Sequence, residues 1–261
     1  MHKFSMIMYP YFVWSLITGG LQIALSNYVN SKIIFYDLLR IYYCPLPEQH
    51  YWFLYTLFLM YLSYVFCNSL FRSIFHYVFL FISIVVYFSN IHTNVRIFDK
   101  YFYNVIFFAL GIFLSKNVLI IKRFSDISIS RFFVIVIMLA FLGCEIGYML
   151  TYGNFKSLAF RLIFAILGIA TVITLAKFLS VNGYFFTLIK VGQCSLYIYL
   201  AHGLFGSGAR ILLNKIFLVE NPIVHVVVGV IAGTVFPIIL YEWSKRNYAS
   251  LLFKPPSLLK V

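Results

Sequence analysis

Eight apolar segments alternate with short polar connections along this chain. Each is long enough, or nearly long enough, to cross a hydrocarbon core of about 30 Å. They lie near residues 6–25, 51–67, 74–88, 101–114, 132–149, 158–176, 192–213 and 223–241. The fourth is short, and we expect its helix to extend into the flanking residues. The apolar runs are continuous rather than alternating, so they predict helices and not the strands of a β-barrel. The predicted fold class is all-α, a polytopic membrane bundle of about 8 transmembrane helices in a single domain, 1–261.

Composition strengthens this prediction. Hydrophobic residues make up 63% of the chain and charged residues only 10%, whereas a soluble domain carries about 25% charged residues. The four cysteines show neither metal-ligand nor redox spacing, so we expect no bound metal or cofactor. The sequence therefore indicates a protein whose main partner is membrane lipid.

The charge is strongly basic, with 20 Lys and Arg against 7 Asp and Glu. The basic residues are spread over the connections between apolar segments, which is typical of topology determinants and argues against nucleic acid as a partner. If the chain enters the membrane from the cytoplasm, twelve of the 20 lie on the inner side and eight on the outer. This bias predicts a multi-pass membrane protein with both termini in the cytoplasm.

Residues 195–202, Ser-Leu-Tyr-Ile-Tyr-Leu-Ala-His, place three polar groups inside an otherwise apolar run. At 100° per residue, Ser195, Tyr199 and His202 fall on one face of a helix. Ionisable groups within membrane helices are costly, and they usually face a polar cavity or a partner. A packed polar cluster that joins two helices is the alternative.

Several polar side chains are expected at one level near the outer end of the bundle. They are His50 and Trp52 at the start of the second segment, His202 in the outer half of the seventh, Glu145 near the outer end of the fifth, and Arg161 near the outer start of the sixth. Two alternatives stay open. Trp52 suits an interfacial aromatic anchor, and Glu145 suits a structural ion pair with Arg161 or Arg210.

Three short motifs carry a family resemblance. Residues 50–54, His-Tyr-Trp-Phe-Leu, are similar to the His-x-Trp-Phe-Leu motif that opens a membrane helix in the acyltransferase-3 family of integral membrane acyltransferases. Residues 195–202, just after Gly192, resemble the family's late Gly-x2-Ser-x3-Tyr-x2-His motif. A weaker match is Tyr9-Pro10-Tyr11 with Trp14, which resembles the family's third helix. The order and spacing of the three agree with the family over essentially the whole chain.

The family usually has ten helices, and its first carries an Arg-x10-His motif held to be essential for transfer. This chain starts where the third helix would start, so the resemblance implies either a true start upstream of Met1 or a relative that lacks the N-terminal two helices. In a full-length relative the upstream histidine would be the main base, with His202 orienting or assisting. An active acyltransferase and a non-catalytic remnant both remain open.

The resemblance implies transfer of an acyl group, commonly acetyl, from acyl-CoA to a sugar hydroxyl of a cell-envelope polysaccharide such as an O-antigen, or of a lipid-linked glycan. An imidazole suits the base, and a hydroxyl suits stabilisation of the oxyanion. Acetyl-CoA is then the donor substrate rather than a bound cofactor. The expected catalytic residues are His202, His50 and Glu145, and the expected acceptor-binding residues are Trp52, Ser195, Tyr199 and Arg161.

The donor's phosphates need a basic approach on the inner side of the membrane. The connection 116–131 carries four basic residues for this role, Lys116, Lys122, Arg123 and Arg131. The alternative is that these residues only set topology.

A different class of function, a glycan transporter, flippase or polymerase, is a further alternative. Glycan polymerases usually carry a large extracytoplasmic loop, and the longest connection here is only 26–50. Transporters often show matching helix breaks in two halves, and Pro10 has no such counterpart.

Overall fold

The computed structural model covers the whole chain and describes residues 2–28, 33–45, 50–150, 157–181, 186–245 and 248–255. Within these ranges the regular structure is entirely helical. The α-helices are α1 (His2–Ala24), α2 (Phe35–Leu39), α3 (Trp52–Phe71), α4 (Phe75–Phe88), α5 (Arg96–Lys116), α6 (Val118–Asp126), α7 (Arg131–Leu150), α8 (Leu158–Val181), α9 (Phe186–Gln193), α10 (Ser195–Lys215) and α11 (Pro222–Ser244). Short 3-10 turns lie at η1 (Arg40–Tyr42), η2 (Arg72–Ile74) and η3 (Tyr248–Leu252).

Each of the eight apolar segments is a helix, which confirms the all-α membrane bundle. In the described part of the chain, six helices are long and apolar enough to cross a membrane, namely α3, α5, α7, α8, α10 and α11, and α4 is a shorter apolar helix. As expected, α5 extends beyond the segment 101–114 on both sides. The short helices α2, α6 and α9 were not predicted, because so few residues leave little periodic signal. The chain is a multi-pass membrane protein.

Local sequence explains where two of the long helices begin. The side chain of Asn221 accepts a hydrogen bond from the backbone N–H of Ile223 at 2.9 Å, and Pro222 follows it as the first residue of α11. The Ser130 hydroxyl accepts one from the backbone N–H of Phe133 at 3.1 Å, at the start of α7. Both side chains satisfy an N–H that has no partner within its own helix.

The chain divides into two compact units. Unit 1 comprises residues 1–63, 95–101 and 190–261, and unit 2 comprises residues 64–94 and 102–189. Both histidines of the sequence motifs belong to unit 1.

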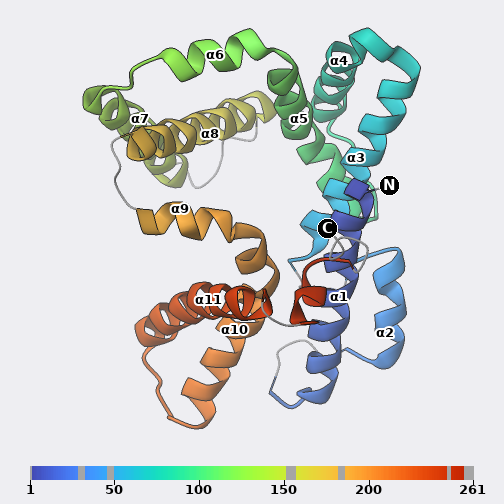
Figure 1. Cartoon of the computed structure of the whole chain (residues 1–261), viewed down its shortest axis with the longest axis vertical. Coiled ribbons are helices and arrows are strands. Elements are labelled where there is room, and N and C mark those ends of the chain that lie inside the picture. The colour runs from blue at the N-terminus through green and yellow to red at the C-terminus, as the bar shows by residue number, and fades with distance from the viewer. Residues whose placement is uncertain are drawn as a thin grey trace. The chain divides into compact units, whose positions relative to one another are not determined.

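The core of unit 1 joins α1, the start of α3, α10 and the C-terminal turn (Figure 1). Trp14 Nε1 donates to the Leu252 carbonyl at 2.9 Å, and the Tyr9 hydroxyl donates to the Leu251 carbonyl at 2.7 Å. Phe253, only 4% exposed, packs beside Trp14 with ring centroids 5.5 Å apart. The C-terminal turn is therefore an integral part of this core.

Helices α10 and α11 lie side by side, and glycines let their backbones approach closely (Figure 1). A Cβ on Gly206 would lie 3.3 Å from the Gly229 carbonyl oxygen, and one on Gly233 would lie 3.3 Å from the His202 carbonyl oxygen. Small residues at such crossings are usual between membrane helices. The segment of α10 that carries His202 is therefore supported from one side by α11.

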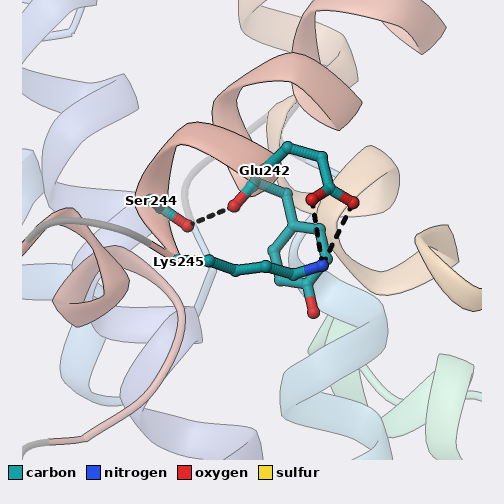
Figure 2. A network of polar contacts seen from close by, with 4 residues as sticks. Glu242, Ser244 and Lys245 are labelled. Carbon is teal, nitrogen blue, oxygen red and sulfur yellow. Dashed lines mark hydrogen bonds and ion pairs between the residues drawn. The ribbon is translucent and has the colours of Figure 1, made fainter.

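Aromatic stacking and an ion pair extend this contact at the end of α11. The rings of Tyr197 and Tyr241 stack with centroids 3.6 Å apart. Figure 2 shows Lys245 Nζ reaching both carboxylate oxygens of Glu242, at 3.0 and 3.1 Å, and the same nitrogen lies 4.4 Å from the centroid of the Tyr241 ring. The pair is about half-exposed, so we assign it little stabilisation. The half-buried tyrosine stack contributes more to this junction.

In unit 2, α7 packs against α8, and Gly168 leaves room for the Phe141 ring. The Tyr87 hydroxyl of α4 donates to the Leu158 carbonyl at the start of α8 at 3.1 Å. Many large apolar side chains of both units are exposed. This is the surface expected of helices that face lipid.

Candidate functional site

His50, two residues before the start of α3, lies against His202 of α10. The two ring centroids are 4.3 Å apart, and the ring planes are inclined at 50°. His50 is half-buried and His202 is exposed. The structure thus brings together the two imidazoles that the sequence motifs carry.

The position of this pair along α10 follows from the bounds of the helix, which begins at Ser195 and ends at Lys215. That His202 lies towards the outer side of the membrane stays a prediction. His202 lies in the first half, about 10 Å along the axis from the start of α10. The beginning of α3 meets α10 at this level.

Two tyrosine hydroxyls hold the start of α3 against α10. The Tyr199 hydroxyl donates to the His50 carbonyl, and the hydroxyl of Tyr51 donates to the Leu200 carbonyl at 2.9 Å. The hydroxyl proton of Tyr51 is used in the bond to Leu200. In the 2.9 Å contact between the hydroxyls of Thr18 and Tyr51, Thr18 of α1 is therefore the donor and the Tyr51 oxygen accepts. Tyr51 is completely buried. The two residues just before α3 are therefore tied to two consecutive residues of α10 by bonds in both directions, and α1 supports the junction.

Backbone contacts orient the His202 ring. Its Nδ1 lies 2.8 Å from the Tyr199 carbonyl oxygen and 3.1 Å from that of Ile198. A carbonyl oxygen only accepts hydrogen bonds, so Nδ1 carries the proton in this arrangement. The neutral ring then has its lone pair on Nε2. An exposed imidazole with a free Nε2 lone pair can accept a proton from a hydroxyl.

His50 is kept neutral by its surroundings. Burial lowers the pKa of His50 to about 4, and the nearby His202 acts in the same direction, whereas bonds to the backbone of Tyr199 and Leu200 oppose the shift. The Nε2 of His50 is buried without a hydrogen-bond partner among the described residues. Because an unpaired buried polar atom is costly, this nitrogen is a candidate for contact with a bound molecule.

Ser195 begins α10, seven residues before His202, and Trp52 begins α3, two residues after His50. The α10 helix is continuous from Ser195 to Lys215, so Ser195, Tyr199 and His202 share a face as the spacing predicts. Ser195 is exposed. The ammonium of Lys100 lies 4.8 Å from the centroid of the Trp52 ring, a cation–π distance. One face of this indole is therefore already in contact with a cation.

Comparison with known families agrees with the motifs. A family model described as an acyltransferase domain, that of the acyltransferase-3 family, matches residues 1–242. The chain belongs to the acyltransferase-3 family. It is therefore a membrane acyltransferase in general terms. No curated protein and no solved structure matches it significantly.

Two further predicted site residues of this acyltransferase lie in unit 2. Glu145 is half-buried on α7, and Arg161 is exposed on α8. In the part of unit 2 that the structure describes, the two side chains form no ion pair with each other. The convergence of Glu145 and Arg161 on the histidines stays a prediction.

The four basic residues predicted to meet the donor also belong to unit 2. Lys116 ends α5, Lys122 and Arg123 lie on α6, and Arg131 begins α7; all four are exposed. Two of the four charges, those of Lys122 and Arg123, thus lie next to each other on the short helix α6. This arrangement leaves the charges available to an anionic ligand.

Sequence reasoning missed the residues that hold the pair together. Thr18 and Tyr51 were not singled out, although Tyr51 stands inside the first motif, between His50 and Trp52. Neither was Lys100, which lies in the first turns of α5. A buried tyrosine in a membrane helix needs a partner for its hydroxyl, and this was the available signal for Tyr51.

Proposed function

We propose that this acyltransferase moves an acetyl group from cytoplasmic acetyl-CoA to a sugar hydroxyl of a cell-envelope polysaccharide or lipid-linked glycan. The observation that carries the proposal is the contact between His50 and His202, with ring centroids 4.3 Å apart, within a chain of this family. Polar groups in a membrane protein are retained where they serve a substrate or an ion. We place the chain in the bacterial inner membrane with both termini in the cytoplasm.

In this proposal His202 binds the acceptor hydroxyl through Nε2 and assists in taking up its proton. The acceptor oxygen attacks the acetyl carbonyl carbon, the carbon–sulfur bond breaks, and CoA leaves as a thiolate that takes up a proton. The products are the sugar ester and free CoA. His50 stays neutral because of its lowered pKa, and its ring packs against the acceptor-binding His202.

The neighbouring residues are given supporting roles. Ser195 offers its hydroxyl to the oxyanion, and Tyr199, whose proton is used by the His50 carbonyl, positions His50. Trp52 stacks on the sugar with the ring face that Lys100 does not occupy. Arg161 contributes to acceptor binding, and Glu145 acts as the carboxylate partner of an imidazolium.

On the donor side, Lys116, Lys122, Arg123 and Arg131 bind the phosphates of acetyl-CoA. Their exposure on and around α6 supports this role, as does the preference of phosphate for lysine and arginine donors. The proposal therefore separates a donor-binding basic segment from an acceptor-binding histidine pair.

The test uses the organism that carries the gene. Deletion should remove ester-linked acetyl from its surface polysaccharide, and the wild-type gene should restore it. His202→Ala should not restore it, although the variant reaches the membrane at normal levels, and Lys215→Gln, an exposed position at the far end of α10, should. Restoration by His202→Ala would refute the role of the pair. Unchanged acetylation with loss of the glycan from the surface would point to a transporter instead.

A further inference from the structure

The residue after His202 has no side chain, and the His50 ring occupies the space beside it. A Cβ on Gly203 would lie 2.9 Å from Cε1 and 3.2 Å from Nδ1 of His50. The first distance is closer than real Cβ atoms approach. An alanine at this position therefore requires the imidazole to move.

Backbone conformation does not explain this glycine. Gly203 lies within the continuous helix α10, and its φ is not in the left-handed region. Glycine inside a helix costs about 1 kcal/mol relative to alanine. The packing of the His50 ring against Gly203 offsets this cost.

Neither partner is free to move apart and make room for a methyl group. The start of α3 is held to α10 by the bonds from Tyr199 to the His50 carbonyl and from Tyr51 to the Leu200 carbonyl. On its other side, α10 is backed by α11, where Gly233 lies close to the His202 carbonyl oxygen. Added volume at Gly203 must therefore be absorbed by rotation of the short His50 side chain.

We infer that Gly203 is a positioning residue for acyl transfer, which sets the contact between the His50 and His202 imidazoles by leaving the space that the His50 ring fills. This rests on the proposed function of the pair. Gly203 itself touches no reacting atom and acts through His50.

The same helix provides a matched control. A Cβ on Gly208 would meet nothing within 4 Å, so Gly208→Ala makes the same chemical change in the same helix without displacing a neighbour. The two substitutions thus differ in whether the added methyl group meets the His50 ring.

The first measurement does not depend on activity. Diethyl pyrocarbonate acylates neutral imidazole nitrogens, and mass spectrometry of the purified full chain reports the rate at each histidine. In wild type we expect His202 to react and His50, with its buried Nε2, to be protected. Gly203→Ala should raise the rate at His50 towards that of His202, and Gly208→Ala should leave it unchanged. An unchanged rate at His50 in folded Gly203→Ala would overturn the inference.

The second measurement is acetyl transfer in membranes with labelled acetyl-CoA. Gly203→Ala should lower transfer roughly 10²-fold, the cost of a displacement of about 1 Å at a reacting group, while Gly208→Ala should retain it. In a His50→Ala background, where no ring blocks the methyl group, Gly203→Ala should cause no further loss. An equal loss in both backgrounds would show a purely structural role.

The two measurements separate the possible failures. Absence of transfer by wild type, with the expected protection of His50, would reject the proposed function and leave the packing role of Gly203 intact. The double variant also serves if Gly203→Ala alone does not fold, because removal of the His50 ring should restore folding.

Discussion

The carbonyl of His50 accepts a hydrogen bond from the hydroxyl of Tyr199 on α10. The His50 ring lies against His202, which follows Tyr199 by three residues on the same helix. The backbone of His50 is thus held by Tyr199 of α10, and its ring packs beside His202 of the same helix. His202 lies within α10, and His50 lies two residues before the start of α3. This relationship makes the geometry of the pair open to test by single substitutions.

The pH dependence of stability should report on His50. Its pKa in the folded protein is lowered from 6.5 to about 4. Between these values the unfolded chain binds a proton that the folded chain does not, so the free energy of unfolding rises with pH across this window and levels off above it. We expect thermal unfolding in detergent to show this rise in wild type and a smaller one in His50→Gln. Identical slopes would contradict the burial of a neutral imidazole.

Removal of the Tyr51 hydroxyl should loosen the junction of α1, α3 and α10. Tyr51→Phe leaves the Thr18 hydroxyl without its partner and deletes the bond to the Leu200 carbonyl. We expect a loss of about 1–2 kcal/mol in the free energy of unfolding, measured by thermal unfolding in detergent. Tyr36→Phe, at a position 76% exposed, is the control and should have no measurable effect.

The C-terminal turn should contribute strongly to the stability of unit 1. Phe253 is buried among Trp14, Tyr197 and Tyr241, so Phe253→Ala should leave a cavity and cost about 3–5 kcal/mol. Phe35→Ala, at a site 72% exposed, is the comparison. Equal melting temperatures for the two variants would show that the turn is dispensable for folding.

The basic segment should govern the affinity for the donor. The double substitution Lys122→Gln with Arg123→Gln removes two exposed charges of α6 without touching the histidine pair, which lies in the other unit. We expect the KM for acetyl-CoA to rise about tenfold or more, since a hydrogen bond to a charged group contributes about 1.5–3 kcal/mol, while kcat changes little. Lys190→Gln, an exposed basic residue of α9, should leave KM unchanged. A rise of the same size in this control would indicate a general effect of surface charge.

The hydrophobic pattern was sufficient to predict the long helices and the membrane location. An apolar run in lipid has no alternative to a helix or a closed barrel, and all eight segments were found as helices with ends shifted by a few residues. The motifs around His50 and His202 were likewise sufficient to indicate the family. These properties are local, because each follows from residues that are neighbours along the chain.

The tertiary structure alone decided what holds the histidines together. The tyrosine bonds from Tyr51 and Tyr199, the space beside Gly203, and the cation over Trp52 all join residues from different helices. Helical periodicity specifies which face a side chain occupies but not which neighbour it meets. Which neighbour a side chain meets depends on how whole helices pack against one another. No single stretch of this sequence specifies that packing.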